Sequence, residues 1–149
     1  MARQLKKVLC PIDFSPDSFT ALDYAADFAR QSNGQVTLMH VVDNPLTDFY
    51  GPRGANFYAE VEHAIEKSKQ MLADAARTRV SGVPYEVVVK HGNPYTEIID
   101  LATAQPADVI VMSTHGRTGP QRLVIGSVTE KVVRTAPCPV FTVRHAAET

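Results

Sequence analysis

Short apolar runs alternate with segments of helical periodicity along the whole chain, and this alternation constrains the fold more than any other feature. The strand-like runs cover residues 7–13, 36–42, 85–90, 108–112 and 140–143. Near-continuous apolar strands are typical of a parallel sheet that helices cover on both faces. Strands that alternate with helices favour right-handed crossover connections. The pattern therefore predicts an α/β fold built on an open parallel sheet.

Turn and cap residues separate these strands from the helices between them. The predicted helices cover residues 16–30, 56–80, 94–105 and 128–133. Ser15-Pro16 begins the first of them, because proline suits the first turn of a helix. Residues 43–55 are rich in proline and glycine and predict a loop.

Length, charge and cysteine content narrow the class of protein. The chain has 149 residues, the size of one ordinary domain, so we expect residues 1–149 to form a single domain. A formal net charge of -1 gives no general basic field for nucleic acid. We expect no membrane segment and a cytoplasmic location, because no signal-like or bilayer-length apolar run occurs. Cys10 and Cys138 lack metal-ligand spacing and are predicted to be buried, reduced thiols.

A stretch rich in glycine and small polar residues follows the fourth strand-like run. Residues 112–119 read MSTHGRTG, and Gly126-Ser127 precede the last predicted helix. Glycines let the backbone approach a ligand, and a helix start offers N–H groups and a positive dipole end to an anion. Ordinary turns have the same composition. A phosphate site and a plain loop are therefore both open interpretations of this stretch.

Three segments would meet at one edge of the sheet if the first and fourth strands are neighbours. They are Asp13, residues 41–43 and residues 113–116, each at the carboxyl end of a predicted strand. Open sheets of this kind bind ligands beyond the carboxyl ends of the strands, where the strand order reverses.

Several side chains at this edge have two interpretations. Ser127 and Thr129 could donate to phosphate oxygens, but Ser127 could instead cap the helix. Arg117 could add a charged donor or simply be solvated. A carboxylate about 4 Å from a phosphate charge is repelled by roughly 4 kcal/mol at an effective dielectric of 20. Asp13 would therefore need a bridging Mg²⁺ or a ribose hydroxyl, unless it only caps the following helix.

The histidines and the missing motifs limit the chemistry further. His115 is more often structural than catalytic in such a position, and His40 fits a hydrogen-bonded residue of the core or of a cleft wall. The chain has no P-loop motif, no dinucleotide fingerprint after a strand and no nucleophile elbow. A receiver domain would need adjacent acids after the first strand and an Asp after the third. No catalytic residue is predicted.

Taken together, these motifs resemble the universal stress protein family over essentially the whole chain. The family's signature is Gly-x2-Gly-x9-Gly-[Ser/Thr]; its second glycine matches Gly116, its spacer residues 117–125, and its end Gly126-Ser127. Residues 11–13, 40–42 and 136–140 look like further family features. Ser113 stands where the first glycine is expected, and its side chain could either clash with a ligand or bond to it.

The resemblance implies a flavodoxin-like sheet in the order 3-2-1-4-5 and an adenine nucleotide ligand such as ATP, with Mg²⁺ on Asp13. The implied contacts are Pro11, Ile12 and Asp13 with adenosine and the metal or ribose, Val41 with adenine, Met112 and Ser113 with ribose and phosphates, and Gly116, Arg117, Gly126, Ser127, Val128 and Thr129 with the phosphates. His115, in the same loop, is counted with these candidates. The family commonly dimerises through its last strand, here Val140–Val143, and an apolar edge strand is usually paired or covered.

The predicted function is an ATP-binding stress-response module with at most slow hydrolysis. Two alternatives remain. One is an interaction protein of the same fold in which Ser113 has closed the pocket, and the other is a weak Mg²⁺-dependent ATPase that uses Asp13.

Overall fold

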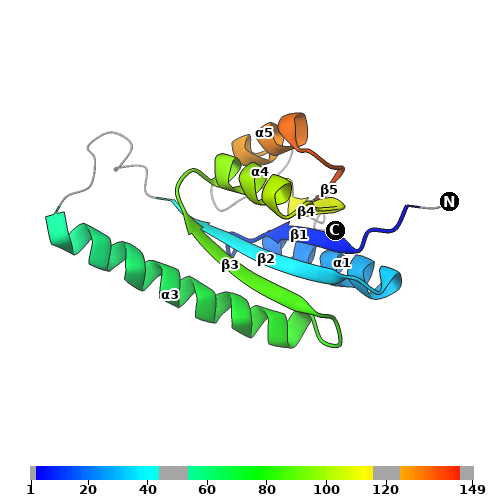
Figure 1. Ribbon diagram of the computed structural model, residues 1–149, viewed down its shortest axis with the longest axis horizontal. Helices are drawn as coiled ribbons and strands as arrows, with labels where there is room; N and C mark the ends of the chain where they lie inside the picture. The colour runs from blue at the N-terminus through cyan, green and yellow to red at the C-terminus, as the bar shows by residue number, and fades with distance from the viewer. Residues whose placement is uncertain (1–2, 44–53, 116–124, 145–149) are drawn as a thin grey trace, which may run out of the picture.

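The computed structural model describes residues 3–43, 54–115 and 125–144, and its elements alternate as the sequence predicts (Figure 1). In chain order they are β1 (Lys7–Pro11), α1 (Pro16–Ser32), β2 (Gln35–Val42), α3 (Gly54–Arg79), β3 (Tyr85–His91), α4 (Pro94–Ala104), β4 (Val109–Ser113), α5 (Ser127–Thr135) and β5 (Val140–Val143). The prediction of a loop as far as residue 55 is wrong by two residues, because α3 already begins at Gly54. Helix ends are set by backbone bonding more than by propensity, so glycine is tolerated there.

The strands form one parallel sheet in the order β3-β2-β1-β4-β5, which confirms the predicted order. β1 pairs with β4 through Val8↔Val109 and Leu9↔Ile110, so the first and fourth strands are neighbours. β2 and β3 extend the sheet on one side of β1, and β4 and β5 extend it on the other side. The strand order therefore reverses between β1 and β4, where a ligand crevice is expected in open sheets.

Helices cover both faces of the sheet (Figure 1). α1 and α3 lie on one face, and α4 and α5 lie on the other. Alternate residues of each strand point to opposite faces, so Val8 packs with α1 and α3 while Leu9 packs with α4 and α5. This explains the near-continuous apolar strands. α3 continues beyond the carboxyl ends of β2 and β3, and its first turns project past the edge of the sheet.

The two cysteines are both free, but only one is buried as predicted. Cys10 is fully buried in the core beneath α1, and burial, together with the nearby charge of Asp23, raises the pKa of its thiol. Cys138 is only partly buried, which corrects the prediction for that residue. Its pKa is raised mainly by desolvation. Raised pKa values keep both groups in the unreactive thiol form.

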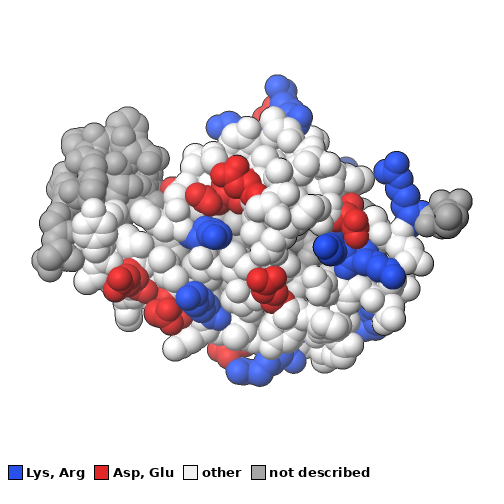
Figure 2. Space-filling view, in the orientation of Figure 1, with Lys and Arg blue, Asp and Glu red and all other residues white. Residues whose placement is uncertain are grey.

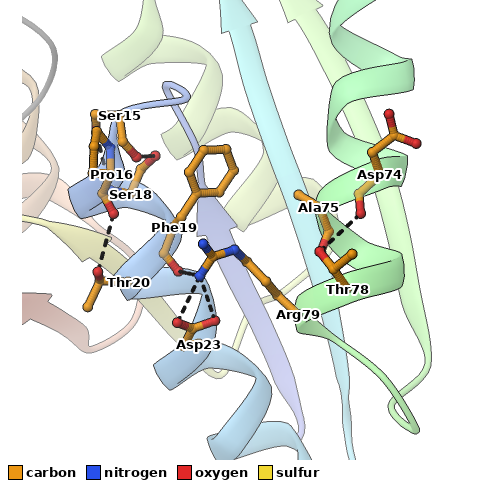
Figure 3. Close-up of polar contacts among 10 residues, drawn as sticks. All are labelled: Ser15, Pro16, Ser18, Phe19, Thr20, Asp23, Asp74, Ala75, Thr78 and Arg79. Carbon is orange, nitrogen blue, oxygen red and sulfur yellow. Dashed lines mark hydrogen bonds and ion pairs between the residues drawn. The ribbon is translucent and has the colours of Figure 1, made fainter.

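An ion pair with an aromatic contact ties the end of α3 to α1 (Figure 3). Arg79 Nη1 lies 2.9 and 3.1 Å from the two carboxylate oxygens of Asp23. The Arg79 guanidinium also lies 5.1 Å from the centre of the Phe19 ring. The Arg79 and Asp23 side chains are 39% and 52% exposed, so the ion pair adds little stability.

Charges of both signs are interspersed over the face that Figure 2 shows. Lys and Arg lie close to Asp and Glu there. On α3, Lys69 pairs with Glu66 at 3.4 Å. That face therefore has no extended basic surface of the kind that nucleic acid requires. Within the described ranges, no helix is long and apolar enough to cross a membrane.

Candidate functional site

A cavity of about 520 Å³ opens where the strand order reverses, at the carboxyl ends of β1, β2 and β4. This volume is within the range of small-molecule sites. The three segments that the sequence analysis placed at this edge do converge on it. The predicted site residues that line it are Pro11, Ile12, Asp13, Val41, Met112, Ser113, Gly126, Ser127, Val128 and Thr129. His115 is not among its lining residues, and Gly116 and Arg117 lie outside the described residues.

Gly126, Ser127, Val128 and Thr129 form one side of the cavity, here called the α5 wall. Gly126 is the N-cap of α5, and no side chain caps this helix start. The alternative prediction that Ser127 caps the helix is therefore wrong, because Ser127 occupies the first helical position instead. The first N–H groups of a helix have no partner within the helix. The α5 wall thus presents backbone donors and the positive end of a helix dipole to the cavity.

The Thr129 hydroxyl and the Gly126 N–H connect α5 with the end of β4. Thr129 Oγ1 donates to the Ser113 carbonyl at 2.9 Å, and the Gly126 N–H donates to the Thr114 carbonyl at 2.7 Å. The Thr129 side chain is 4% exposed. Its hydroxyl hydrogen is thus already used and is not available to a phosphate in this arrangement.

Ser113, at the position of a family glycine, also has an internal partner. Its Oγ donates to the His115 carbonyl at 2.9 Å, and the residue is 7% exposed. The Ser113 hydroxyl hydrogen is therefore already used within the protein, and the side chain is held in place by this bond. It fixes the first turn of the loop that leaves β4.

His115 is buried beside this turn. Its Nδ1 lies 3.1 Å from Thr114 Oγ1, and its Nε2 has no hydrogen-bond partner in the part of the chain that the structure describes. This placement agrees with a structural interpretation of the residue, because the ring belongs to the loop base rather than to the cavity lining.

Asp13 connects β1 to the start of α1. Its Oδ1 accepts hydrogen bonds from the Ser15 N–H at 3.0 Å and the Ser15 hydroxyl at 2.5 Å. Ser15 is the true N-cap of α1, since its side chain accepts from the Ser18 N–H. The prediction that Asp13 caps the helix is therefore wrong: Asp13 instead holds Ser15, the residue that does. The same carboxylate lines the cavity, so a role toward a ligand is compatible with this bonding.

The turn after Asp13 is held by aromatic contacts with β2. Phe14 adopts a left-handed conformation with φ of 67°, which turns the chain sharply, and its ring lies 4.5 Å from that of His40. His40 Nδ1 lies 2.7 Å from the Ile12 carbonyl oxygen. His40 also lines the cavity, which confirms the prediction of a hydrogen-bonded residue in the core or cleft wall.

The side of the cavity next to α4 is apolar. Met39, Val41, Ile98 and Met112 line it and belong to one buried cluster, with exposed fractions between 0% and 8%. By contrast, the charged lining residues known from the described chain are Asp13 and Asp43, with no lysine or arginine. No group of three or more His, Cys, Asp or Glu side chains in the described chain could hold a metal ion on its own.

Sequence reasoning missed a further side of the cavity, which carries one hydroxyl. Ala64 and Ser68 on α3 line it opposite α5 and are here called the α3 wall. Ser68 lies on the inward stripe of an amphipathic helix whose other inward residues are mostly apolar. A serine in such a stripe is a recognisable signal, but the spacing alone does not separate a core position from a cavity position. Pro94 and Ile98 on α4 were also missed as lining residues, whereas Asp43 belongs to the segment 41–43 that was expected at this edge.

Comparisons with known proteins agree on one family. The model of the universal stress protein family matches residues 4–144. Universal stress protein MJ0531 of Methanocaldococcus jannaschii is 32% identical over 145 residues, which cover 93% of this chain and 82% of that protein. The solved structure of MJ0577 from the same organism is 27% identical, with a TM-score of 0.84, and the match covers 98% of this chain and 100% of that one.

A more distant structure has the same fold. The universal stress protein from Archaeoglobus fulgidus, solved in complex with dAMP, has a TM-score of 0.61 at 19% identity, over 94% of this chain and 98% of that one. Similarity at this level concerns the fold alone, whereas the family model extends over nearly the whole sequence. This chain belongs to the universal stress protein family.

Proposed function

We propose that this protein binds an adenine nucleotide in the cavity at the carboxyl edge of its sheet. The observation that carries the proposal is the uncapped start of α5, which faces a cavity of about 520 Å³ beside an apolar side. An anion suits the helix start, and a flat base suits the apolar side. The family relationship supports the same ligand class, since one relative of this fold was solved with dAMP.

The two sides of the cavity suggest how the ligand lies. The phosphates would lie at Gly126, Ser127 and Val128, where the helix start offers the N–H groups of Ser127 and Val128; the Gly126 N–H already donates to the Thr114 carbonyl. The base would lie against Val41, Ile98 and Met112, with the ribose near Asp13. Gly116 and Arg117 retain their proposed role toward the phosphates on sequence grounds alone.

Asp13 makes a divalent cation part of the proposal. A triphosphate brought into a lining with two carboxylates, and with no lysine or arginine in its described part, is repelled unless a cation intervenes. Mg²⁺ is commonly held by one or two carboxylates together with substrate phosphates rather than by a protein cage. The donor set fits this arrangement, with Asp13 as the protein ligand and the cation arriving with ATP.

We infer a regulatory rather than a catalytic role for the bound nucleotide. The Asp13 carboxylate already accepts two hydrogen bonds from Ser15, and the His115 ring lies outside the cavity lining. Neither is placed as a general base for a water. The protein would thus act as a single-domain stress-response module whose nucleotide state alters its stability or its partners, with at most slow hydrolysis.

Titration calorimetry with Mg-ATP tests the ligand, together with native mass spectrometry of freshly purified protein. We expect binding heat, a rise in melting temperature and a mass increment equal to an adenine nucleotide. Ser127→Ala should weaken ATP binding, whereas Thr135→Ala at the other end of α5 should not, because that hydroxyl donates to Lys131 within the helix. Absence of heat and of a melting shift at millimolar Mg-ATP would remove the proposal.

We also propose that β5 pairs two copies of the chain. Within the described chain, β5 lies at the end of the sheet with β4 as its strand neighbour. Phe141 is 39% exposed, and its ring lies 5.7 Å from Tyr24 and 4.9 Å from Phe28 on α1. Phe141→Glu should halve the mass measured by light scattering, while Tyr58→Glu, at an exposed aromatic residue on α3, should leave it unchanged. A monomeric wild-type protein at micromolar concentration would contradict this.

A further inference from the structure

The hydroxyl of Ser68 differs from those of most other serines and threonines in the described helices. Thr20, Thr78, Thr103 and Thr135 each donate to the carbonyl four residues earlier, at 2.7 to 3.3 Å, and Figure 3 shows the first two. The buried Ser18 donates to the Ser15 carbonyl, and Thr129 to the Ser113 carbonyl. Among serines and threonines of the described helices, Ser68 and Ser127 are the two whose hydroxyls have no hydrogen bond to a described residue.

These two serines share a location, but only one of them is buried. Both line the cavity; Ser127 is exposed to solvent at the start of α5, whereas Ser68 is 7% exposed. An exposed hydroxyl can bond to water at no cost. The Ser68 oxygen is not sealed inside the protein, because among the described residues the buried side-chain atom without a partner is His115 Nε2. The Ser68 hydroxyl therefore opens on the cavity and is available to a group that occupies it.

The neighbours of Ser68 on the same face of α3 offer its hydroxyl no hydrogen-bond partner. Leu72, one turn later on the same face, is fully buried, and Ala64, one turn earlier, lines the cavity as Ser68 does. An apolar residue would suit this inward stripe better than serine unless the hydroxyl is used. Ser68 does not bond to the carbonyl of residue 64, which is the usual partner for a serine within a helix.

We propose that Ser68 hydrogen-bonds the uncharged nucleoside part of the bound nucleotide and so determines specificity from the α3 wall. The inference rests on the proposed function. α3 and α5 lie on opposite faces of the sheet (Figure 1), so a ligand with its phosphates at α5 and its ribose near Asp13 can reach Ser68 only with its nucleoside part. The described lining contains Asp13 and Asp43 and no basic side chain, and it therefore disfavours a second anionic group beside α3.

Calorimetry on Ser68→Ala with ATP, AMP and adenosine, each in the presence of Mg²⁺, tests this contact. Loss of one hydrogen bond to a neutral group should weaken all three ligands by a similar factor of about 3 to 10. The melting temperature of the ligand-free variant should stay the same or rise, because a buried hydroxyl without a protein partner is removed. Thr78→Ala, on the same helix but bonded to Asp74 and Ala75, should bind all three ligands as the wild type does (Figure 3).

The outcomes separate this contact from the nucleotide proposal itself. A wild-type protein that binds none of the three ligands removes the proposed function and this inference with it. If the wild type binds and Ser68→Ala binds equally well, the function stands and the Ser68 contact is overturned. A loss seen with ATP but absent with adenosine would place Ser68 at the phosphates and overturn the assignment to the nucleoside. A matching loss in Thr78→Ala would assign the effect to the α3 helix as a whole.

Discussion

The α3 wall and the α5 wall of the cavity offer a ligand different interactions. The α5 wall presents backbone N–H groups and a helix dipole with no side-chain cap, and Ser127 there is exposed. The α3 wall consists of the partly buried Ala64 and the buried Ser68, and it offers a single hydroxyl, that of Ser68. A dipole end attracts an anion whatever the rest of the ligand is. A single buried hydroxyl distinguishes ligands by the presence of a matching group.

The two walls are also anchored differently. The α5 wall is fixed to β4 by two hydrogen bonds, from Thr129 Oγ1 to the Ser113 carbonyl and from the Gly126 N–H to the Thr114 carbonyl. The α3 wall is fixed by apolar packing at Leu72, with the Arg79–Asp23 pair at the far end of the helix. Changes at α5 should therefore act on ligand charge, and changes along α3 should act on ligand identity or on helix stability.

The largest effect is expected from a negative charge on the α5 wall. Ser127→Glu places a carboxylate where a phosphate would bind, and the repulsion of about 4 kcal/mol at 4 Å, reduced by solvent, should weaken ATP binding about 100-fold or more. The same charge should stabilise the ligand-free protein by about 0.3–1 kcal/mol, because it lies at a helix N-terminus. Calorimetry and thermal unfolding measure these two opposite effects.

Ser127→Gln is the matched control, because it has the same length without the charge. It should weaken ATP binding by less than about tenfold, consistent with the loss of one hydrogen bond. Adenosine should bind Ser127→Glu as it binds the wild type. Equal losses for ATP and adenosine would show that the α5 wall does not distinguish charge, and the contrast between the two walls would fail.

A smaller effect is expected at Asp13, between the two walls. Asp13→Asn keeps an oxygen that can accept from Ser15, so the start of α1 should be preserved. The variant loses the charge that would hold Mg²⁺, and it no longer repels metal-free ATP. The ratio of ATP affinities with Mg²⁺ and with EDTA should therefore fall by about tenfold, consistent with loss of one charge-assisted interaction. An unchanged ratio in calorimetry would exclude Asp13 as a metal ligand.

The smallest effect is expected from the anchor of α3. Asp23→Asn removes the ion pair with Arg79, whose side chains are 39% and 52% exposed for Arg79 and Asp23. The free energy of unfolding should fall by less than about 1 kcal/mol, and the difference should shrink in high salt. Nucleotide affinity should stay within about twofold of the wild type. A large loss of affinity would show that the far end of α3 controls the α3 wall.

Particular residues show where sequence reasoning succeeded and where it did not. Asp13, Val41 and Ser113 were placed at one edge from strand ends alone, because parallel strands bring their carboxyl ends together. Ser127 was given two interpretations, and only the backbone geometry showed that Gly126 holds the cap position. Thr129 was predicted as a phosphate donor, but its hydroxyl meets the Ser113 carbonyl, a partner 16 residues earlier in the chain.

The sequence by itself determined the alternation of strands and helices, the burial of the strands and the position of the glycine-rich loop after β4. These follow from local periodicity, turn residues and spacing, which neighbouring residues encode. Only the tertiary structure decided which hydroxyls are free. Thr78 and Ser68 both lie on α3, yet one bonds within its helix and the other faces a cavity formed by β1, β2, α4 and α5. That difference depends on segments distant in the chain, so no local pattern contains it.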